Sequence, residues 1–183
     1  MRVYLDTGAF IDYLTRRSHA GPFLRTSGRR GRTTDQLSLD ATECFHRIGS
    51  LHEGFTSSLT LYEVERTMYE RLESLSSGLP DHYRYLIASA RPLAFQIMLL
   101  VEYHNIEVLP LDRAVFERVV TEYELQRRGI QVGDSIHIVT AILNNAEILV
   151  STDVDILGLD RVFNNTSGGS IQFVDTDGAL LTL

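Results

Sequence analysis

Short apolar segments alternate with longer helical segments along almost the whole chain, and this alternation limits the choice of fold more than any other feature. The predicted strands span 2–6, 55–58, 106–111, 147–151 and 171–174. Between them, apolar residues recur at helical spacing, as in the helix expected over about 60–75. Strands that alternate with helices favour an α/β fold, in which a central, mainly parallel sheet has helices on both faces.

The remaining segments complete a single domain, which is what a chain of 183 residues with 44% hydrophobic content can bury around one core. Asp112 is the expected N-cap of a helix over 113–128, and a longer helix over 81–104 would bend near Pro92. The segment 18–34 is rich in Gly, Ser, Thr and Arg and is predicted to be an exposed loop insertion. Residues 164–183 are predicted to be a C-terminal extension that includes the last strand.

Composition limits the cellular compartments in which such a protein is expected. The longest apolar run, 92–101, is interrupted by Gln96 and is too short to cross a bilayer, so we expect no membrane association. The single cysteine excludes an internal disulfide framework, and the first residues show no pattern typical of a secretion signal. We therefore expect the protein to be cytoplasmic.

Charge is distributed unevenly along the chain. The net charge of −7 argues against indiscriminate binding to nucleic acids, but a cluster of arginines lies in the predicted loop insertion. Its candidate RNA-binding residues are Arg25, Arg29, Arg30 and Arg32. They could contact RNA phosphates or an acidic partner, or be solvated.

Four acidic residues lie where chemistry is expected in an α/β sheet, at or near the carboxyl ends of strands. Asp6 and Asp153 follow the first and fourth strands, Glu63 lies early in the helix after the second, and Asp134 opens the helix before the fourth. Carboxylates that share a cleft repel one another unless a cation neutralises them, and oxygen ligands favour Mg²⁺ or Mn²⁺. The pattern therefore predicts metal-assisted hydrolysis of a phosphodiester. We expect His137, three residues after Asp134, to be a structural histidine.

Four segments of the sequence resemble the signature segments of PIN-domain ribonucleases, in the order in which that family has them. The segments are 4–10 (YLDTGAF), 56–63 (TSSLTLYE), 133–141 (GDSIHIVTA) and 149–153 (LVSTD). The closest group is the VapC-type toxins of toxin–antitoxin pairs. The resemblance implies a PIN-like three-layer fold with five strands in the order 3-2-1-4-5 and cleavage of RNA by a metal-activated water.

The resemblance also implies roles for individual residues. Asp6, Glu63, Asp134 and Asp153 would form the catalytic acidic site, with Mg²⁺ or Mn²⁺ bound by Asp6, Asp134 and Asp153. Thr7 and Thr152 match positions where the family often has a hydroxyl, and Asp155 is a second candidate for the fourth acid. The implied partners are an RNA substrate, a cognate antitoxin and a second copy of the chain in a homodimer.

Two other functions stay open at this point. One is a PIN nuclease in RNA processing or quality control, and the other is a catalytically idle PIN-like module that only binds RNA or protein. The four acids argue against an idle module, because a repulsive acidic cluster has no purpose without a cation.

Overall fold

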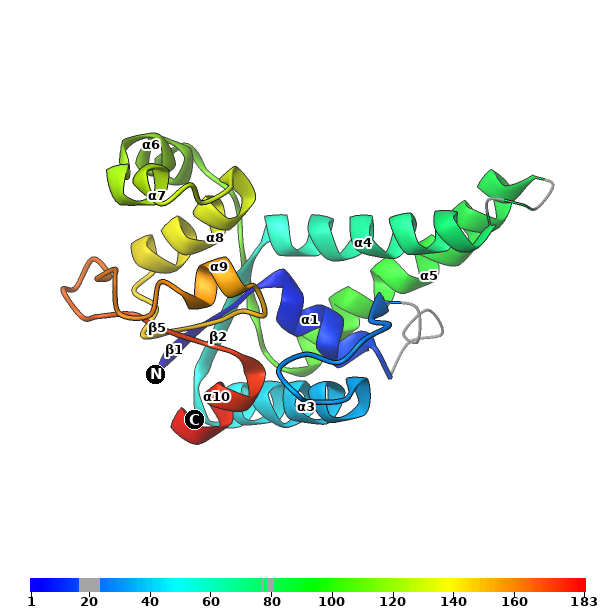
Figure 1. Ribbon diagram of the computed structural model, residues 1–183, viewed down its shortest axis with the longest axis horizontal. Helices are drawn as coiled ribbons and strands as arrows, with labels where there is room; N and C mark the ends of the chain where they lie inside the picture. Colours follow the sequence, from blue (N-terminus) through cyan, green and yellow to red (C-terminus); the bar gives the residue numbers. More distant parts are fainter. Residues whose placement is uncertain (17–23, 77, 79–80) are drawn as a thin grey trace.

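The protein, described here from a computed structural model covering residues 1–16, 24–76, 78 and 81–183, is built around a five-stranded parallel sheet (Figure 1). The strands are β1 (Arg2–Leu5), β2 (Glu53–Ser57), β3 (Glu107–Leu109), β4 (Ile148–Val150) and β5 (Gln172–Val174). Their order in the sheet is β3-β2-β1-β4-β5, and every neighbouring pair is parallel. The predicted α/β fold and strand order are confirmed.

Helices connect the strands and cover both faces of the sheet. They are α1 (Thr7–Leu14), α3 (Thr34–Leu51), α4 (Ser58–Ser76), α5 (His82–Tyr103), α6 (Arg113–Thr121), α7 (Tyr123–Arg127), α8 (Val132–Leu143), α9 (Val154–Leu157) and α10 (Thr176–Thr182). In the described part of the chain, none of these helices has the length and apolar character needed to cross a membrane.

Alternating residues of the central strands divide the core in two. Val3 and Leu5 pack into one apolar cluster with residues of α1, α3, α4 and α5. Tyr4 and Leu149 face the opposite way and pack with residues of α8, among them Ile138 and Val139. Because successive side chains of a strand point to opposite faces, the buried strands β1 and β4 are apolar on both faces, as a parallel sheet requires.

Several boundaries differ from the predicted ones. The helix predicted over 113–128 is two helices, because Glu122 has a non-helical ψ of 88° and separates α6 from α7. The short helices α9 and α10 follow the fourth and fifth strands and were not predicted. Asp112 caps α6 as predicted, by accepting a hydrogen bond from the Val115 amide. The long helix α5 runs through Pro92, and α4 and α5 lie side by side and extend away from the sheet (Figure 1).

The predicted loop is exposed at Thr26, Ser27, Gly28, Arg30, Gly31 and Thr33, whereas its other described arginines are partly covered. Residues 18–23 lie outside the described part, but Leu24 is buried and Arg25, Arg29 and Arg32 are each less than one-third exposed. These side chains form ion pairs with aspartates of α1, α3 and the start of α10. Buried carboxylates need such partners, and the arginines supply them.

Candidate functional site

Asp6 lies at the carboxyl end of β1, at the point where the chain turns into α1. Leu5 pairs with Val150, so β1 and β4 end side by side, and the backbone amide of Asp6 donates to the Val150 carbonyl at 3.0 Å. The Asp6 carboxylate is only 5% exposed and accepts hydrogen bonds of 2.6 Å from the Thr7 amide and from Ser151 Oγ. These donors hold the carboxylate in one orientation at the edge of the sheet.

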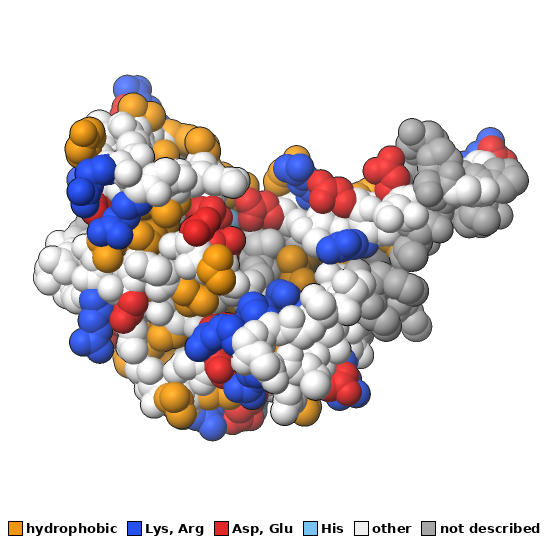
Figure 2. Space-filling view, viewed as in Figure 1, with side chains coloured by type: hydrophobic (Ala, Val, Ile, Leu, Met, Phe, Trp, Pro, Cys, Tyr) orange, Lys and Arg blue, Asp and Glu red, His pale blue; other side chains and the backbone are white. Residues whose placement is uncertain are grey.

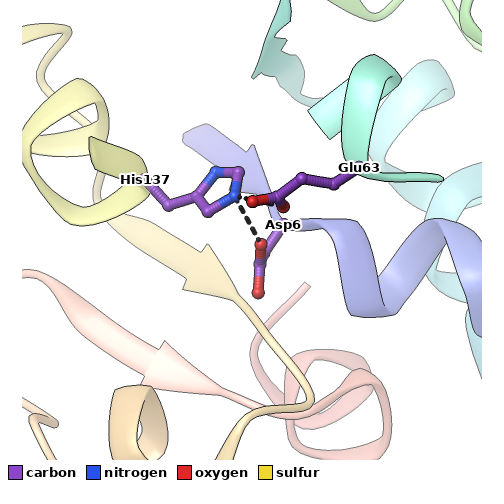
Figure 3. Close-up of side chains that lie close together, drawn as sticks. All are labelled: Asp6, Glu63 and His137. Carbon is purple, nitrogen blue, oxygen red and sulfur yellow. Dashed lines mark hydrogen bonds and ion pairs between the residues drawn. The ribbon is translucent and has the colours of Figure 1, made fainter. Parts of the chain in front are cut away.

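Glu63 and His137 lie against Asp6 and come from different helices. Glu63 lies in the second turn of α4, and its Oε2 accepts a hydrogen bond of 2.5 Å from Thr7 Oγ1. His137 lies on α8, with Nε2 at 2.9 Å from Glu63 Oε2 and 3.3 Å from Asp6 Oδ1 (Figure 3). One ligand atom from each of the three side chains lies within 4.8 Å of the others, so together they could hold a metal ion.

The imidazole of His137 is buried and is held from both of its nitrogens. Nδ1 lies 2.7 Å from the Tyr4 hydroxyl, which donates to Ser57 Oγ at 3.0 Å. Burial lowers the pKa of His137, but Tyr4, Asp6 and Glu63 outweigh burial, so the pKa lies well above its ordinary value. Burial likewise raises the pKa of Glu63, but hydrogen bonds from His137 and Thr7 outweigh it and lower this pKa. The sequence offered one signal for His137, a position one helical turn after Asp134, but not its contact with the acids.

Asp134 lies in the first turn of α8, at the opening of the same site. Its side chain is half-buried, and its pKa is raised from 3.8 to about 6, first by burial and then by the charges of Asp153, Asp6 and Glu63. A side chain at Gly133 would have Cβ at 3.2 Å from Glu63 Oε1, so the absence of a side chain there lets α8 approach α4. The charges of Asp6, Glu63 and Asp153, the three acids predicted to share a site with Asp134, therefore act on its carboxyl group.

The end of β4 supplies the remaining candidates. Asp153 is exposed and caps α9, because its Oδ1 accepts hydrogen bonds from the amides of Asp155 and Ile156. Its charge still acts on Asp134, whereas Asp155 is exposed in the first turn of α9. Thr152 packs against α1, since a Cβ at Gly8 would meet its Oγ1 at 1.9 Å. Figure 2 shows acidic side chains gathered where α4, α8 and α9 meet.

The four candidate RNA-binding arginines belong to an ionic network that joins α1, α3 and the start of α10. Arg25 and Arg29 both pair with Asp12 of α1, which is fully buried, and Arg29 also binds Asp175, the buried N-cap of α10, at 2.6 Å. Burial raises the pKa of Asp12 despite these arginines.

The outer part of the network is more open to solvent. Arg30 lies 3.4 Å from Asp175 and 3.7 Å from Asp177, and Arg32 binds Asp177 and Asp40 of α3. The Arg30 side chain is 56% exposed. It lines a surface pocket together with Val154 and Leu157 of α9. Val154, which lines this pocket, follows Asp153 directly in the sequence.

The fold and the site together define an α/β protein with a half-buried acidic cluster at the carboxyl edge of its parallel sheet. No family model matches the sequence, and no curated protein matches it.

The donor set of the cluster fits a divalent cation. Asp6 and Glu63 present carboxylate oxygens within reach of one another, and Asp134 and Asp153 add negative charge at the opening. Carboxylate oxygens suit Mg²⁺ and Mn²⁺, and an imidazole nitrogen suits transition metals. The pKa of Asp134 is raised mainly by burial and further by the charges of the nearby acids, and a bound cation would offset both effects.

Asp134→Asn is expected to raise the free energy of unfolding of the metal-free protein by about 1–2 kcal/mol at pH 7. Because folding raises the pKa of Asp134 from 3.8 to about 6, ionisation penalises the folded state. This penalty is absent well below pH 3.8, grows as the pH rises through the interval between the two values, and is complete above it. Urea unfolding in EDTA between pH 4 and pH 7 measures the difference.

The matched control for this variant is Asp35→Asn. Asp35 is exposed and pairs with Arg16, so its replacement should change stability by less than about 0.5 kcal/mol, with little dependence on pH over the same interval. A variant Asp134→Asn that is less stable than the original protein at pH 7 would contradict the penalty from burial and nearby acidic charge.

Proposed function

We propose that this protein is a metal-dependent endoribonuclease that hydrolyses RNA phosphodiester bonds. The observation that carries the proposal is the convergence of Asp6, Glu63 and Asp134 at the carboxyl edge of β1 and β4, in a sheet with the strand order 3-2-1-4-5. Ligands of open α/β sheets bind at this edge. The four sequence segments that resemble PIN-domain ribonucleases contain these acids and supply the expectation of RNA as substrate.

Asp6 and Glu63 would hold Mg²⁺ or Mn²⁺, whereas Asp134 and Asp153 lie outside the group whose ligand atoms come within 4.8 Å of one another and would add negative charge at its opening. When bound, such a cation lowers the pKa of a ligated water and neutralises charge that develops on a phosphate. Thr7 orients both inner acids, because its amide donates to Asp6 and its hydroxyl donates to Glu63. Ser151 holds the other oxygen of Asp6. Ligands fixed in this way need little reorganisation when the cation binds.

Contact with the RNA backbone would come from the exposed end of the ionic network. Arg30 is the most exposed of the four arginines and lies beside α9, which follows Asp153 directly. Arg25 and Arg29 are committed to buried aspartates, so their main role is structural. A single exposed guanidinium that shares a pocket with the start of α9 suits one phosphate of a bound strand.

The resemblance to VapC-type toxins further supports a toxin that acts in the cytoplasm as a homodimer and is inhibited by a cognate antitoxin. Surface composition is compatible with protein partners. On α5, Phe95, Met98, Leu99 and Tyr103 are all at least 47% exposed. Exposed apolar side chains that gather on one helix are typical of surfaces that contact other proteins.

Removal of the cation tests the nuclease directly. Purified protein, free of any bound inhibitor, is incubated with total cellular RNA and Mn²⁺ or Mg²⁺, then with EDTA, and then with the metal restored. We expect cleavage with metal, loss of cleavage in EDTA and recovery on restoration. Cleavage that survives thorough EDTA treatment would contradict the metal mechanism, and metal binding without cleavage of any RNA would favour the idle RNA- or protein-binding module.

A further inference from the structure

His137 places one ring nitrogen between the two innermost acids of the site. Nε2 lies 2.9 Å from Glu63 Oε2 and 3.3 Å from Asp6 Oδ1, and Figure 3 shows the ring edge turned toward both carboxylates. Its side chain is 1% exposed, against 29% for Glu63. The nitrogen therefore forms the closed inner wall of the site, and Glu63 lies on its open side.

The other ring nitrogen is already engaged in the interior. Nδ1 lies 2.7 Å from the Tyr4 hydroxyl, and that hydroxyl donates its own hydrogen to Ser57 Oγ. The Tyr4 oxygen is then free to accept a hydrogen bond from Nδ1. Histidines that bind metals are held in this way, with one nitrogen hydrogen-bonded within the protein and the other directed at the ion.

The separations of the three ligand atoms are those of neighbouring ligands on one ion. Two ligand atoms that each lie about 2.1 Å from an ion and subtend a right angle are about 3 Å apart. The distances of 2.9 Å and 3.3 Å from Nε2 to the two oxygens agree with this spacing. In the metal-free protein the shorter contact is a hydrogen bond between His137 and Glu63, so the ion would take the place of the Nε2 proton, which would be released to solvent. All three ligand atoms lie within 4.8 Å of one another, so a single ion could contact each of them.

We propose that His137 Nε2 is itself a metal ligand, together with Asp6 and Glu63, and that the site selects Mn²⁺ or another first-row transition-metal ion over Mg²⁺. The proposal rests on the metal dependence of the proposed function and goes beyond it in assigning the ligand and the metal class. Mg²⁺ prefers an all-oxygen shell, whereas imidazole nitrogen strengthens the binding of transition metals. The sequence alone favoured a structural role for this histidine.

A second buried histidine provides a matched control. His104 is 5% exposed and lies 3.0 Å from a tyrosine hydroxyl, that of Tyr13, so it shares with His137 both burial and an aromatic hydroxyl partner. It belongs to the end of α5 and packs against Phe45 of α3, in the core rather than at the acids. A substitution at His104 therefore reports the cost of losing a buried histidine that is not at the site.

The test uses Mn²⁺ alone as the probe and does not require activity. The full chain is loaded with Mn²⁺, and pulsed electron paramagnetic resonance is recorded for nitrogen bound directly to the ion, with unlabelled and with ¹⁵N-histidine-labelled protein. We expect a nitrogen coupling that changes on labelling. It should disappear in His137→Gln, which should also bind Mn²⁺ at least about 10-fold more weakly, and should persist in His104→Gln. Tyr4→Phe should weaken binding about 10-fold but keep the coupling, because it removes only the support of the ligand.

The possible results distinguish a failure of the proposed histidine ligand from a failure of the proposed nuclease activity. Mn²⁺ that binds without nitrogen coupling, or a coupling that survives in His137→Gln, overturns the histidine ligand and leaves the nuclease intact. Failure to bind Mn²⁺ at all overturns both. A histidine coupling in a protein that cleaves no RNA upholds the ligand and overturns the nuclease. The labelled original protein shows whether any histidine binds the ion, and the weaker Mn²⁺ binding expected of Tyr4→Phe assigns that histidine as His137 where His137→Gln does not fold.

Discussion

Asp6→Asn is expected to lower the rate of metal-dependent RNA cleavage by at least about 100-fold, because loss of a residue that merely supports a metal ligand already costs about 10- to 100-fold. The substitution keeps the shape of the side chain but removes the charge that faces Glu63 and His137. Initial rates on one RNA with a mapped cleavage site, measured at saturating Mn²⁺, give the ratio.

Asp35→Asn is again the control, because it removes an exposed carboxylate that pairs with Arg16 on the surface. Its cleavage rate should stay within about twofold of the original, as for a surface site away from the reacting groups. Circular dichroism and thermal unfolding of both variants establish that each is folded. A folded Asp6→Asn that keeps the original rate would remove Asp6 from the mechanism and the nuclease proposal with it.

Arg29→Gln is expected to lower the free energy of unfolding by about 3–5 kcal/mol. The guanidinium binds Asp12 at 2.9 Å and Asp175 at 2.6 Å, and these aspartates are 0% and 3% exposed. Its loss leaves buried carboxylates without a full counter-charge, and that penalty exceeds the net value of the pair itself. Equilibrium unfolding in urea at pH 7 measures the change.

Arg30→Gln is the neighbouring control. Its side chain is 56% exposed and the guanidinium reaches Asp175 and Asp177 only at 3.4 Å and 3.7 Å, so we expect a loss of less than about 1 kcal/mol in the free energy of unfolding. Equal destabilisation by the two variants would show that the network does not depend on the buried pairs.

The fold could be predicted from the sequence because its strands and long helices carry strong patterns. Val3, Tyr4 and Leu5 form an apolar run, as expected for a strand buried on both faces, and the resemblance to PIN domains supplied the strand order. The short helices α9 and α10, of four and seven residues, could not be predicted because so few residues show no clear helical period. The break at Glu122 lies inside a continuous helical pattern that contains neither proline nor glycine, so the sequence carries no signal for it.

The candidate site was predicted in outline. The pattern placed Asp6, Glu63 and Asp134 at one edge of the sheet, where they lie within electrostatic reach of one another. It did not reveal the contacts of His137 with the acids, because they join residues 74 and 131 positions apart in the chain. The pairing of Arg29 with Asp175, 146 residues later, was hidden for the same reason.

The close approach of Gly8 to Thr152 has a consequence for how sequences of this kind can diverge. A Cβ at position 8 would lie 1.9 Å from Thr152 Oγ1 and 2.8 Å from Thr152 Cβ, so with the present backbone neither serine nor alanine at position 152 would make room for alanine at position 8. Only glycine at position 152 would. The two positions should therefore covary among homologues, and a side chain at the first should be accompanied by the loss of one at the second.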